Sequence, residues 1–279
     1  MKDRLCGCSF IHPQRSLEQG LETVQRLGFS NVDIGVGGGN SHFDAIAVAQ
    51  SPQAFADEVR RAADKFELTI NECFLLNFGP PINTPHLKAR NETLALFRNL
   101  AHGAKQAGFK SILLIAGPTY AELGQAASQQ LAAEAFIPLV EACSENNLQL
   151  NLEADFESCV STPEAATALC QQVPGLGLTL DYSHFVCQGI EPERIEVLHP
   201  YTRHIHIRQA APGYIVAEVD QGTIDFAQVT SQLERSGYNG LYCIEYLSFG
   251  SEDATFQQTE KRTLAMRDEM KNQLAGLKE

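Results

Sequence analysis

The sequence predicts an α/β protein that folds as a single (β/α)8 TIM barrel over residues 1–279. Three observations support this fold class. The length of 279 residues suits one barrel of about 250 residues. Short apolar or β-branched runs recur along the chain, each followed by a longer stretch of helical periodicity, which is typical of repeated βα units. The spacing between runs leaves room for two loops and a crossover helix in every unit.

Eight runs have the composition of strands in a buried parallel sheet. We expect strands at residues 5–10, 32–36, 68–74, 111–116, 148–154, 177–181, 204–208 and 241–246.

The stretches between these runs carry signals for helix ends. Thr84 stands before Pro85, which predicts an N-cap followed by proline at the first helical position. Gly28 and Gly108 each precede a strand, at the place where a glycine commonly ends a helix. We find no interdomain linker or low-complexity segment, so we expect one domain.

Composition and charge exclude several classes of protein. Hydrophobic residues make up 44% and charged residues 20%, which excludes a disordered chain, a collagen and a coiled coil. The net charge of −13 would repel a phosphate backbone, so we expect no nucleic-acid partner. No apolar run approaches the roughly 20 residues that span a bilayer, and the eight cysteines are scattered singly. We therefore expect a cytoplasmic protein with reduced thiols and no membrane partner.

Ionisable residues stand at the ends of four consecutive predicted strands. They are Glu153, Asp181, His206 and Glu245. In a barrel the carboxyl ends of the strands form the active site, and an unpaired charge behind aliphatic residues is costly to desolvate. Three carboxylates and one imidazole would suit a divalent ion such as Mn²⁺ or Mg²⁺, and also Co²⁺ or Zn²⁺. The joint placement predicts a site for one divalent metal ion.

Longer motifs around these residues resemble the xylose isomerase-like barrels, which include sugar isomerases, ketose 3-epimerases, inosose-processing enzymes and type IV apurinic endonucleases. The motifs are LxLEA at Glu153, DxxH at Asp181 and His184, HIHIR at 204–208 followed by QAAPG, and GTIDF at 222–226 leading to IEY at 244–246. The resemblance implies that Glu153, Asp181, His206 and Glu245 are the metal ligands. It also implies that His184 reaches the oxygens of the substrate and that Arg208 is a second polar contact in the pocket.

Several assignments stay open at this point. His204, His206 and Arg208 share one side of a strand, so spacing does not choose between the histidines. The family pattern favours His206 as the ligand and leaves His204 as a deeper residue, and the opposite assignment is the alternative. Asp155 is either a further acid of the pocket or a residue at a helix start.

The loops at the predicted mouth give weaker signals. Residues 36–40 lack the spacing of a phosphate-binding loop and predict a flexible mouth loop. Residues 77–83 are rich in turn formers and are a candidate wall of the pocket. His12, Glu72 and Asn77 either line the pocket or have a loop or core role.

Two branches of the family fit poorly. The endonucleases need additional histidines, yet the fourth strand ends in Ile115-Ala116-Gly117-Pro118 and residues 213–222 contain none. Xylose isomerase proper uses a second metal and a nearby lysine, and no lysine lies in the strand-end motifs. One metal ion is therefore the simpler expectation.

The predicted function is a metal-dependent isomerase or epimerase of a sugar or sugar phosphate. The metal would stabilise an enediolate while Glu153 and Glu245 act as acid and base. One alternative is a lyase or dehydratase acting on a keto-inositol or keto acid, and another is a noncatalytic sugar-binding barrel. The partner would be a small carbohydrate. Homo-oligomers are common among such barrels, although the sequence shows no interface.

Overall fold

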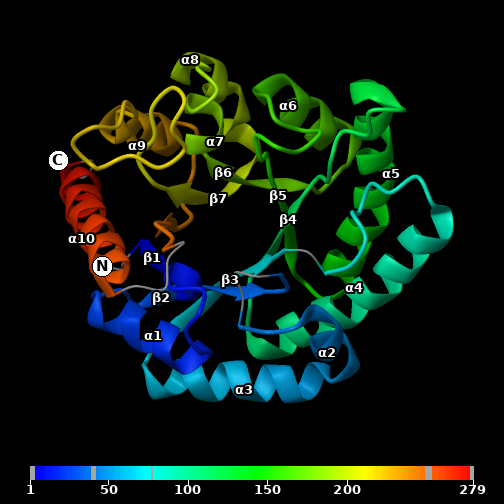
Figure 1. Ribbon diagram of the computed structural model, residues 1–279, viewed down its shortest axis with the longest axis horizontal. Coiled ribbons are helices and arrows are strands. Elements are labelled where there is room, and N and C mark those ends of the chain that lie inside the picture. The colour runs from blue at the N-terminus through cyan, green and yellow to red at the C-terminus, as the bar shows by residue number, and fades with distance from the viewer. Residues whose placement is uncertain (1–3, 39–41, 77, 249–252, 277–279) are drawn as a thin grey trace.

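The eight strands form a closed parallel barrel in the order of the sequence (Figure 1). The structure is a computed structural model that describes residues 4–38, 42–76, 78–248 and 253–276. The strands are β1 (Leu5–Cys8), β2 (Asn31–Val36), β3 (Thr69–Leu75), β4 (Ser111–Ile115), β5 (Gln149–Glu153), β6 (Gly177–Asp181), β7 (Thr202–Ile207) and β8 (Tyr242–Ile244). The predicted (β/α)8 TIM barrel is confirmed.

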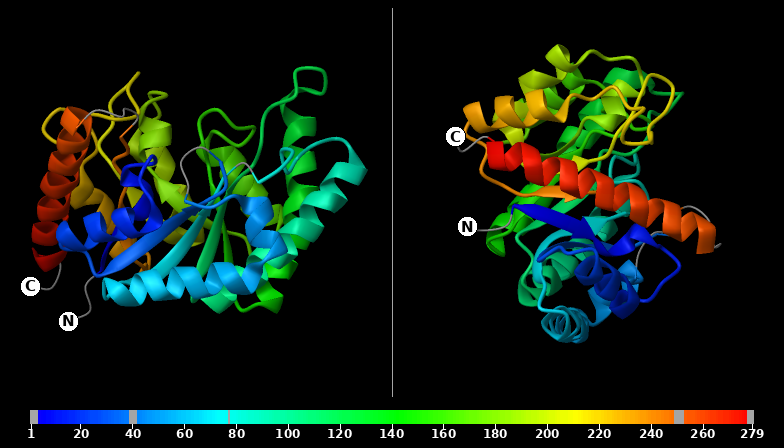
Figure 2. Two further views of the ribbon diagram at one scale, coloured as in Figure 1. Left: turned by 60° about the horizontal axis from the view of Figure 1, so that its bottom comes forward. Right: turned by 90° about the vertical axis from the view of Figure 1, so that its left-hand side faces the viewer.

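Helices surround the barrel, and α10 packs beside the first and last strands (Figure 2). The α-helices are α1 (Leu17–Arg26), α2 (Ala45–Gln50), α3 (Pro52–Lys65), α4 (Leu87–Ala107), α5 (Gly124–Glu145), α6 (Pro163–Gln172), α7 (Ser183–Val186), α8 (Pro192–Ile195), α9 (Phe226–Arg235) and α10 (Asp253–Gly276). Two short 3-10 helices are η1 (Ser9–Ile11) and η2 (Glu196–Tyr201). Apolar side chains from both layers form one continuous buried core.

Several predicted boundaries are wrong by one or two residues, and the eighth strand, for example, spans only Tyr242–Ile244. The first strand ends at Cys8, because the chain turns directly into η1. The seventh strand begins two residues early, at Thr202. The fourth helix begins at Leu87, with His86 in the cap position, because the Thr84 hydroxyl accepts the backbone N–H of His86 in a turn (3.4 Å) instead of capping the helix.

Strand register places two of the predicted site residues, Asp181 and His206, level with each other in the barrel. Asp181 of β6 pairs with His206 of β7, and Glu153 of β5 pairs with Ile115 of β4. Thr179 pairs with His204 one level below. Because alternate residues of a strand face the same side, the barrel interior holds an upper level at the strand ends and a deeper level beneath it.

Two expectations about loops fall partly outside the described residues. These are the mouth loop 36–40, of which residues 39 and 40 are not described, and Asn77. None of the helices in the described part of the chain combines the length and the apolar character needed to cross a membrane.

Candidate metal centre

The structure brings the four predicted ligands together at the carboxyl end of the barrel, and all four are buried. His206 is the centre of the group, since its Nδ1 lies 3.1 Å from Oε1 of Glu153 and 3.3 Å from Oε2 of Glu245. Donor atoms of these three residues all lie within 4.8 Å of one another. Glu153 also forms such a group with Asp181 and His184. Glu153 therefore links two adjoining sets of donor atoms.

Arg208 closes the site on the side of Asp181 and Glu245. Its Nη2 lies 2.7 Å from Oδ2 of Asp181 in an ion pair, and its Nη1 donates to Oε2 of Glu245 (3.1 Å). Its Nε donates to the hydroxyl of Ser183 (2.8 Å). Burial by itself would lower the pKa of Arg208, but the charges of Asp181 and Glu245 outweigh it and raise the pKa. The guanidinium thus remains a fixed positive charge between two acids.

His184 stands next to Arg208 at the start of α7. Its Nε2 lies 2.9 Å from Nη2 of Arg208, and its Nδ1 lies 3.4 Å from Oδ2 of Asp155. Asp155 starts no helix, because its other oxygen accepts the backbone N–H of Glu157 in a turn and α6 begins later. Of the two alternatives for Asp155, the structure supports an acid beside the site.

The two glutamates lie in contrasting electrostatic surroundings. Burial raises the pKa of Glu153, and the hydrogen bond with His206 opposes that rise only in part. Burial would also raise the pKa of Glu245, but the charges of His206 and Arg208 outweigh it and lower the pKa to about 2. Burial would lower the pKa of His206, yet its acidic neighbours raise it well above the ordinary value.

The donor set fits a divalent cation. Two buried carboxylates, Glu153 and Glu245, converge on one nitrogen of His206, so one ion could be shared by oxygen atoms from two strands and by that nitrogen. Oδ2 of Asp181 is buried and has no hydrogen-bond partner in the part of the chain that the structure describes, although it is ion-paired with Arg208. Carboxylate oxygens with one imidazole are the donors preferred by Mn²⁺ or Mg²⁺.

A second set of polar side chains lies deeper in the barrel, and the sequence reading missed its central member, Asp33. Oδ2 of Asp33 lies 2.6 Å from Nε2 of His204, so His204 is the deeper of the two histidines. Glu72 accepts hydrogen bonds from Ser111, Asn151 and Thr179. The available signal for Asp33 was an acid inside the apolar run of β2.

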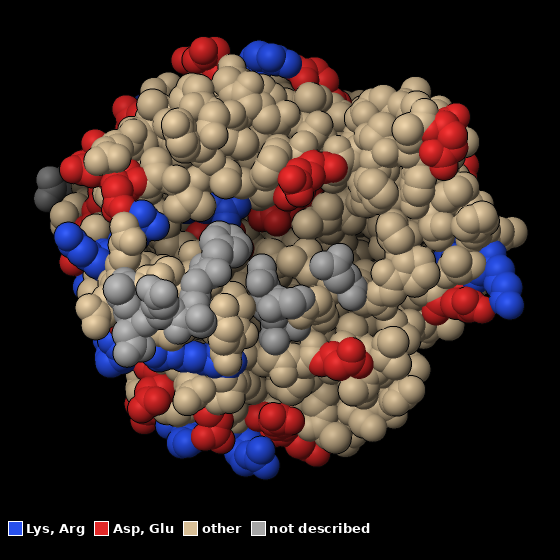
Figure 3. Space-filling model, in the orientation of Figure 1, with Lys and Arg blue, Asp and Glu red and all other residues tan. Residues whose placement is uncertain are grey.

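The structure assigns different roles to the residues whose roles the sequence left open. Glu72 has a core role, as described above. His12 also turns away from the site, because its Nε2 lies 3.0 Å from Oε1 of Glu260 on α10. Residues 78–82 line a pocket of about 270 Å³ beside the ends of β3 and β4, with Leu76 and Ile115 among its other walls. On the face shown in Figure 3, acidic and basic side chains lie side by side near the central hollow.

Comparison with known proteins agrees with this architecture. No curated protein sequence matches the chain. A structure of L-ribulose 3-epimerase has a TM-score of 0.77 at 18% identity and covers 99% of this chain and 96% of its own. A 3-keto-D-glucoside 4-epimerase, YcjR from E. coli, has a TM-score of 0.72 at 16% identity and covers 96% and 100%. A D-allulose 3-epimerase from Methylomonas sp., in complex with D-allulose, has a TM-score of 0.72 at 13% identity and covers 98% and 97%.

The sequence profile of one family spans most of the chain, from residue 21 to residue 271. On this match, the chain belongs to the xylose isomerase-like TIM barrel family.

Proposed function

We propose that this protein is a divalent-metal-dependent isomerase or epimerase of a sugar or sugar phosphate. Glu153, Asp181, His206 and Glu245 hold one metal ion, and Glu153 and Glu245 also transfer the protons. The observation that carries the proposal is the approach of Glu153 and Glu245, from β5 and β8, to the same nitrogen of His206 at 3.1 and 3.3 Å. Sugar epimerases among the similar structures support the reaction class.

Two carboxylates on either side of one centre suit proton transfer at carbon. When bound, the metal supplies positive charge that polarises a carbonyl of the substrate. One glutamate removes the proton next to that carbonyl, and the other returns a proton to the opposite face or to the neighbouring carbon.

His184 and Arg208 orient the substrate in this proposal. Their side chains touch each other at 2.9 Å, and Arg208 also contacts Asp181 and Glu245. A sugar hydroxyl that enters beside them can accept a hydrogen bond from the guanidinium and exchange one with the imidazole. Such fixed donors position the reacting carbon relative to the two glutamates.

Solvent proton exchange tests the proposal directly. The purified protein is incubated in D2O with Mn²⁺, Mg²⁺ or Co²⁺ and a panel of ketoses that includes D-allulose, D-tagatose and L-ribulose, and deuterium is located by NMR. We expect deuterium at the carbon next to the carbonyl. Glu153→Gln and Glu245→Gln should each reduce incorporation by about 10²–10⁴-fold, the usual contribution of an acid or base.

The matched control is Glu164→Gln, because Glu164 pairs with Arg194 on the exposed surface. Its exchange rate should equal that of the wild type. Undiminished exchange in both site variants would contradict the proposal. A conjugated enone that absorbs in the ultraviolet would instead identify a dehydratase, and binding of sugars without exchange would identify a noncatalytic barrel.

A further inference from the structure

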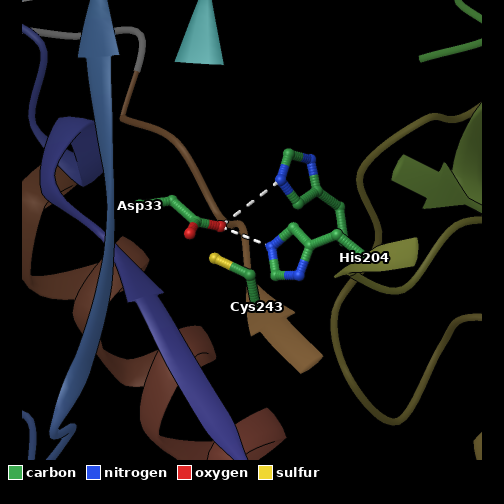
Figure 4. A group of neighbouring side chains, drawn as sticks. Asp33, His204 and Cys243 are labelled. Atoms are coloured by element: carbon green, nitrogen blue, oxygen red, sulfur yellow. Dashed lines mark hydrogen bonds and ion pairs between the residues drawn. The ribbon is translucent and has the colours of Figure 1, made fainter. Parts of the chain in front are cut away.

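A buried acid lies directly beneath His206 and connects the two histidines of β7. Oδ2 of Asp33, on β2, is 2.6 Å from Nε2 of His204 and 3.7 Å from Nε2 of His206. All three side chains are buried. Figure 4 shows the carboxylate of Asp33 directed towards the ring of His204 and towards a second imidazole ring, with Cys243 of β8 alongside. Asp33 is not one of the four proposed metal ligands, and the proposed function gives it no role.

The hydrogen bonds of Asp33 leave one acceptor position open. Its Oδ1 accepts from Nδ2 of Asn71 and from the backbone N–H of Glu72, each at 2.9 Å, and Sγ of Cys6 lies 3.4 Å away. Its Oδ2 has His204 as its hydrogen-bond partner within the described chain. Because a carboxylate oxygen has two lone pairs, Oδ2 has room for one more donor.

His206 has one nitrogen to match that position. Its Nδ1 faces Glu153 and Glu245, whereas its buried Nε2 has no hydrogen-bond partner among the described residues. The acids nearest to Nε2 are Asp33 at 3.7 Å and Glu72 at 3.9 Å. The Glu72 oxygen that faces His206 is Oε2, which accepts one hydrogen bond, from Thr179. Each facing oxygen thus carries one hydrogen bond, and Asp33 is the better-placed acceptor because its Oδ2 is the nearer of the two.

We propose that Asp33 is a positioning residue of the metal centre, which accepts the Nε2–H of His206 and so directs Nδ1 towards Glu153 and Glu245. The inference rests on the proposed metal site. A metal binds the unprotonated nitrogen of an imidazole, and the partner of the other nitrogen decides which one that is. His204 keeps the shared oxygen of Asp33 pointed into the barrel.

The same residues include a set of donors for a second ion. Donor atoms of Asp33, His204, His206 and Cys243 lie within 4.8 Å of one another. A metal there would have to replace the 2.6 Å hydrogen bond between Asp33 and His204. Burial also raises the pKa of the Cys243 thiol well above its ordinary value, and a thiol binds metal only as the thiolate. The hydrogen bond from His204 to Asp33, with a second one that the same oxygen can accept from His206, accounts for the cluster more simply.

Metal affinity and the protonated nitrogen of His206 test this role together. Affinity for Mn²⁺ is measured by competition with a chelating dye in the wild type, Asp33→Asn, Glu72→Gln and Glu153→Gln. Asp33→Asn should weaken binding by about 10–100-fold, as loss of a partner behind a metal ligand commonly does. Glu72→Gln is the matched control, an acid on the next strand, and should change affinity by less than about threefold, because Oε2 of Glu72 lies farther from Nε2 of His206 than Oδ2 of Asp33 does.

The second readout needs no substitution at Asp33, so it holds even if that variant does not fold. In ¹⁵N-labelled, Zn²⁺-loaded wild type, NMR should show a proton on Nε2 of His206 and none on Nδ1. A proton on Nδ1 would overturn the role of Asp33. Equal affinities of wild type and Asp33→Asn, or a larger loss in Glu72→Gln, would overturn it too.

Two further outcomes separate this inference from the proposed function. Two ions per chain, with a thiolate-to-cobalt absorption band that Cys243→Ser removes, would replace the positioning role with a second metal site. Failure of the wild type to bind any ion would instead remove the proposed function. Weaker metal binding in Asp33→Asn, with about one ion per chain still bound at saturation, supports both the positioning role of Asp33 and the proposed function.

Discussion

The two halves of the barrel are built from the same repeating unit, yet they place their acids at different depths. In the second half, Glu153 and Asp181 are the last residues of β5 and β6, and Glu245 directly follows β8. In the first half, Asp33 and Glu72 lie inside β2 and β3. The strand ends of β3 and β4 border a pocket with mainly apolar walls.

Hydrogen bonding follows this difference in depth. Glu72 accepts three side-chain hydrogen bonds, and Oδ1 of Asp33 also accepts three, one of them from the backbone. Glu153 has one hydrogen-bonding side chain, His206, among the described residues. An acid surrounded by fixed donors is part of the core, whereas an acid at a strand end keeps free lone pairs for a ligand. Depth within the strand, more than residue type, separates the two roles.

Removal of Glu72 should have the largest effect on stability. Glu72→Ala leaves Ser111, Asn151 and Thr179 without an acceptor, and each buried unsatisfied group costs about 1–3 kcal/mol. We expect a loss of about 3–5 kcal/mol in the free energy of unfolding, measured with urea. Glu153→Ala should change it by less than about 1 kcal/mol, because its removal also relieves the repulsion with Glu245. Equal losses of unfolding free energy in Glu72→Ala and Glu153→Ala would contradict the distinction between core acids and strand-end acids.

Removal of metal should lower the Tm, and this effect should depend on the acids of the second half of the barrel and not on those of the first. An ion that binds the folded chain at a hundred times its Kd stabilises it by about 2.7 kcal/mol. Addition of EDTA should therefore lower the Tm of the wild type and of Glu72→Gln by several degrees. Glu153→Gln should show no such shift. Loss of the EDTA effect in Glu72→Gln would place metal binding in the deeper level instead.

The smallest expected effect is a dependence of stability on pH, which arises at the contact between His12, next to η1, and Glu260 of α10. Burial lowers the pKa of His12. Burial would raise the pKa of Glu260, but hydrogen bonds from Arg26 and His12 outweigh it and lower the pKa. Both groups bind protons more readily in the unfolded chain, so stability should fall as the pH falls below about 6.5, the ordinary pKa of histidine.

A comparison of Tm between pH 7 and pH 5.5 measures this response. Replacement of both residues, in His12→Gln/Glu260→Gln, should make the decrease shallower than in the wild type. An unchanged slope would show that the contact between η1 and α10 contributes nothing to the pH dependence.

The sequence predicted the barrel well because its periodicity is local. Apolar runs and helix-end glycines determine the conformation of the residues next to them. The structure has a strand at each of the eight predicted places. Errors arose where a local signal had two readings, as at Thr84, whose hydroxyl serves a turn instead of the helix cap.

The candidate site was predictable only as a set of strand ends. Its residues could be found because polar residues at the ends of apolar runs stand out. The contacts among them could not, because they join distant parts of the chain, such as Asp33 with His204, 171 residues apart. Spacing also left His204 and His206 equivalent, and only the strand register shows that His206 is the one level with Asp181. The metal-binding role of these residues remains a prediction.

Metal content tests the central claim most directly, because it needs no knowledge of the substrate. Wild type and Glu153→Gln are loaded with Mn²⁺, dialysed without chelator and analysed by elemental mass spectrometry. The account predicts about one ion per chain in the wild type and a large loss in the variant. A wild type that holds no ion after loading, or a variant that holds as much as the wild type, would contradict it.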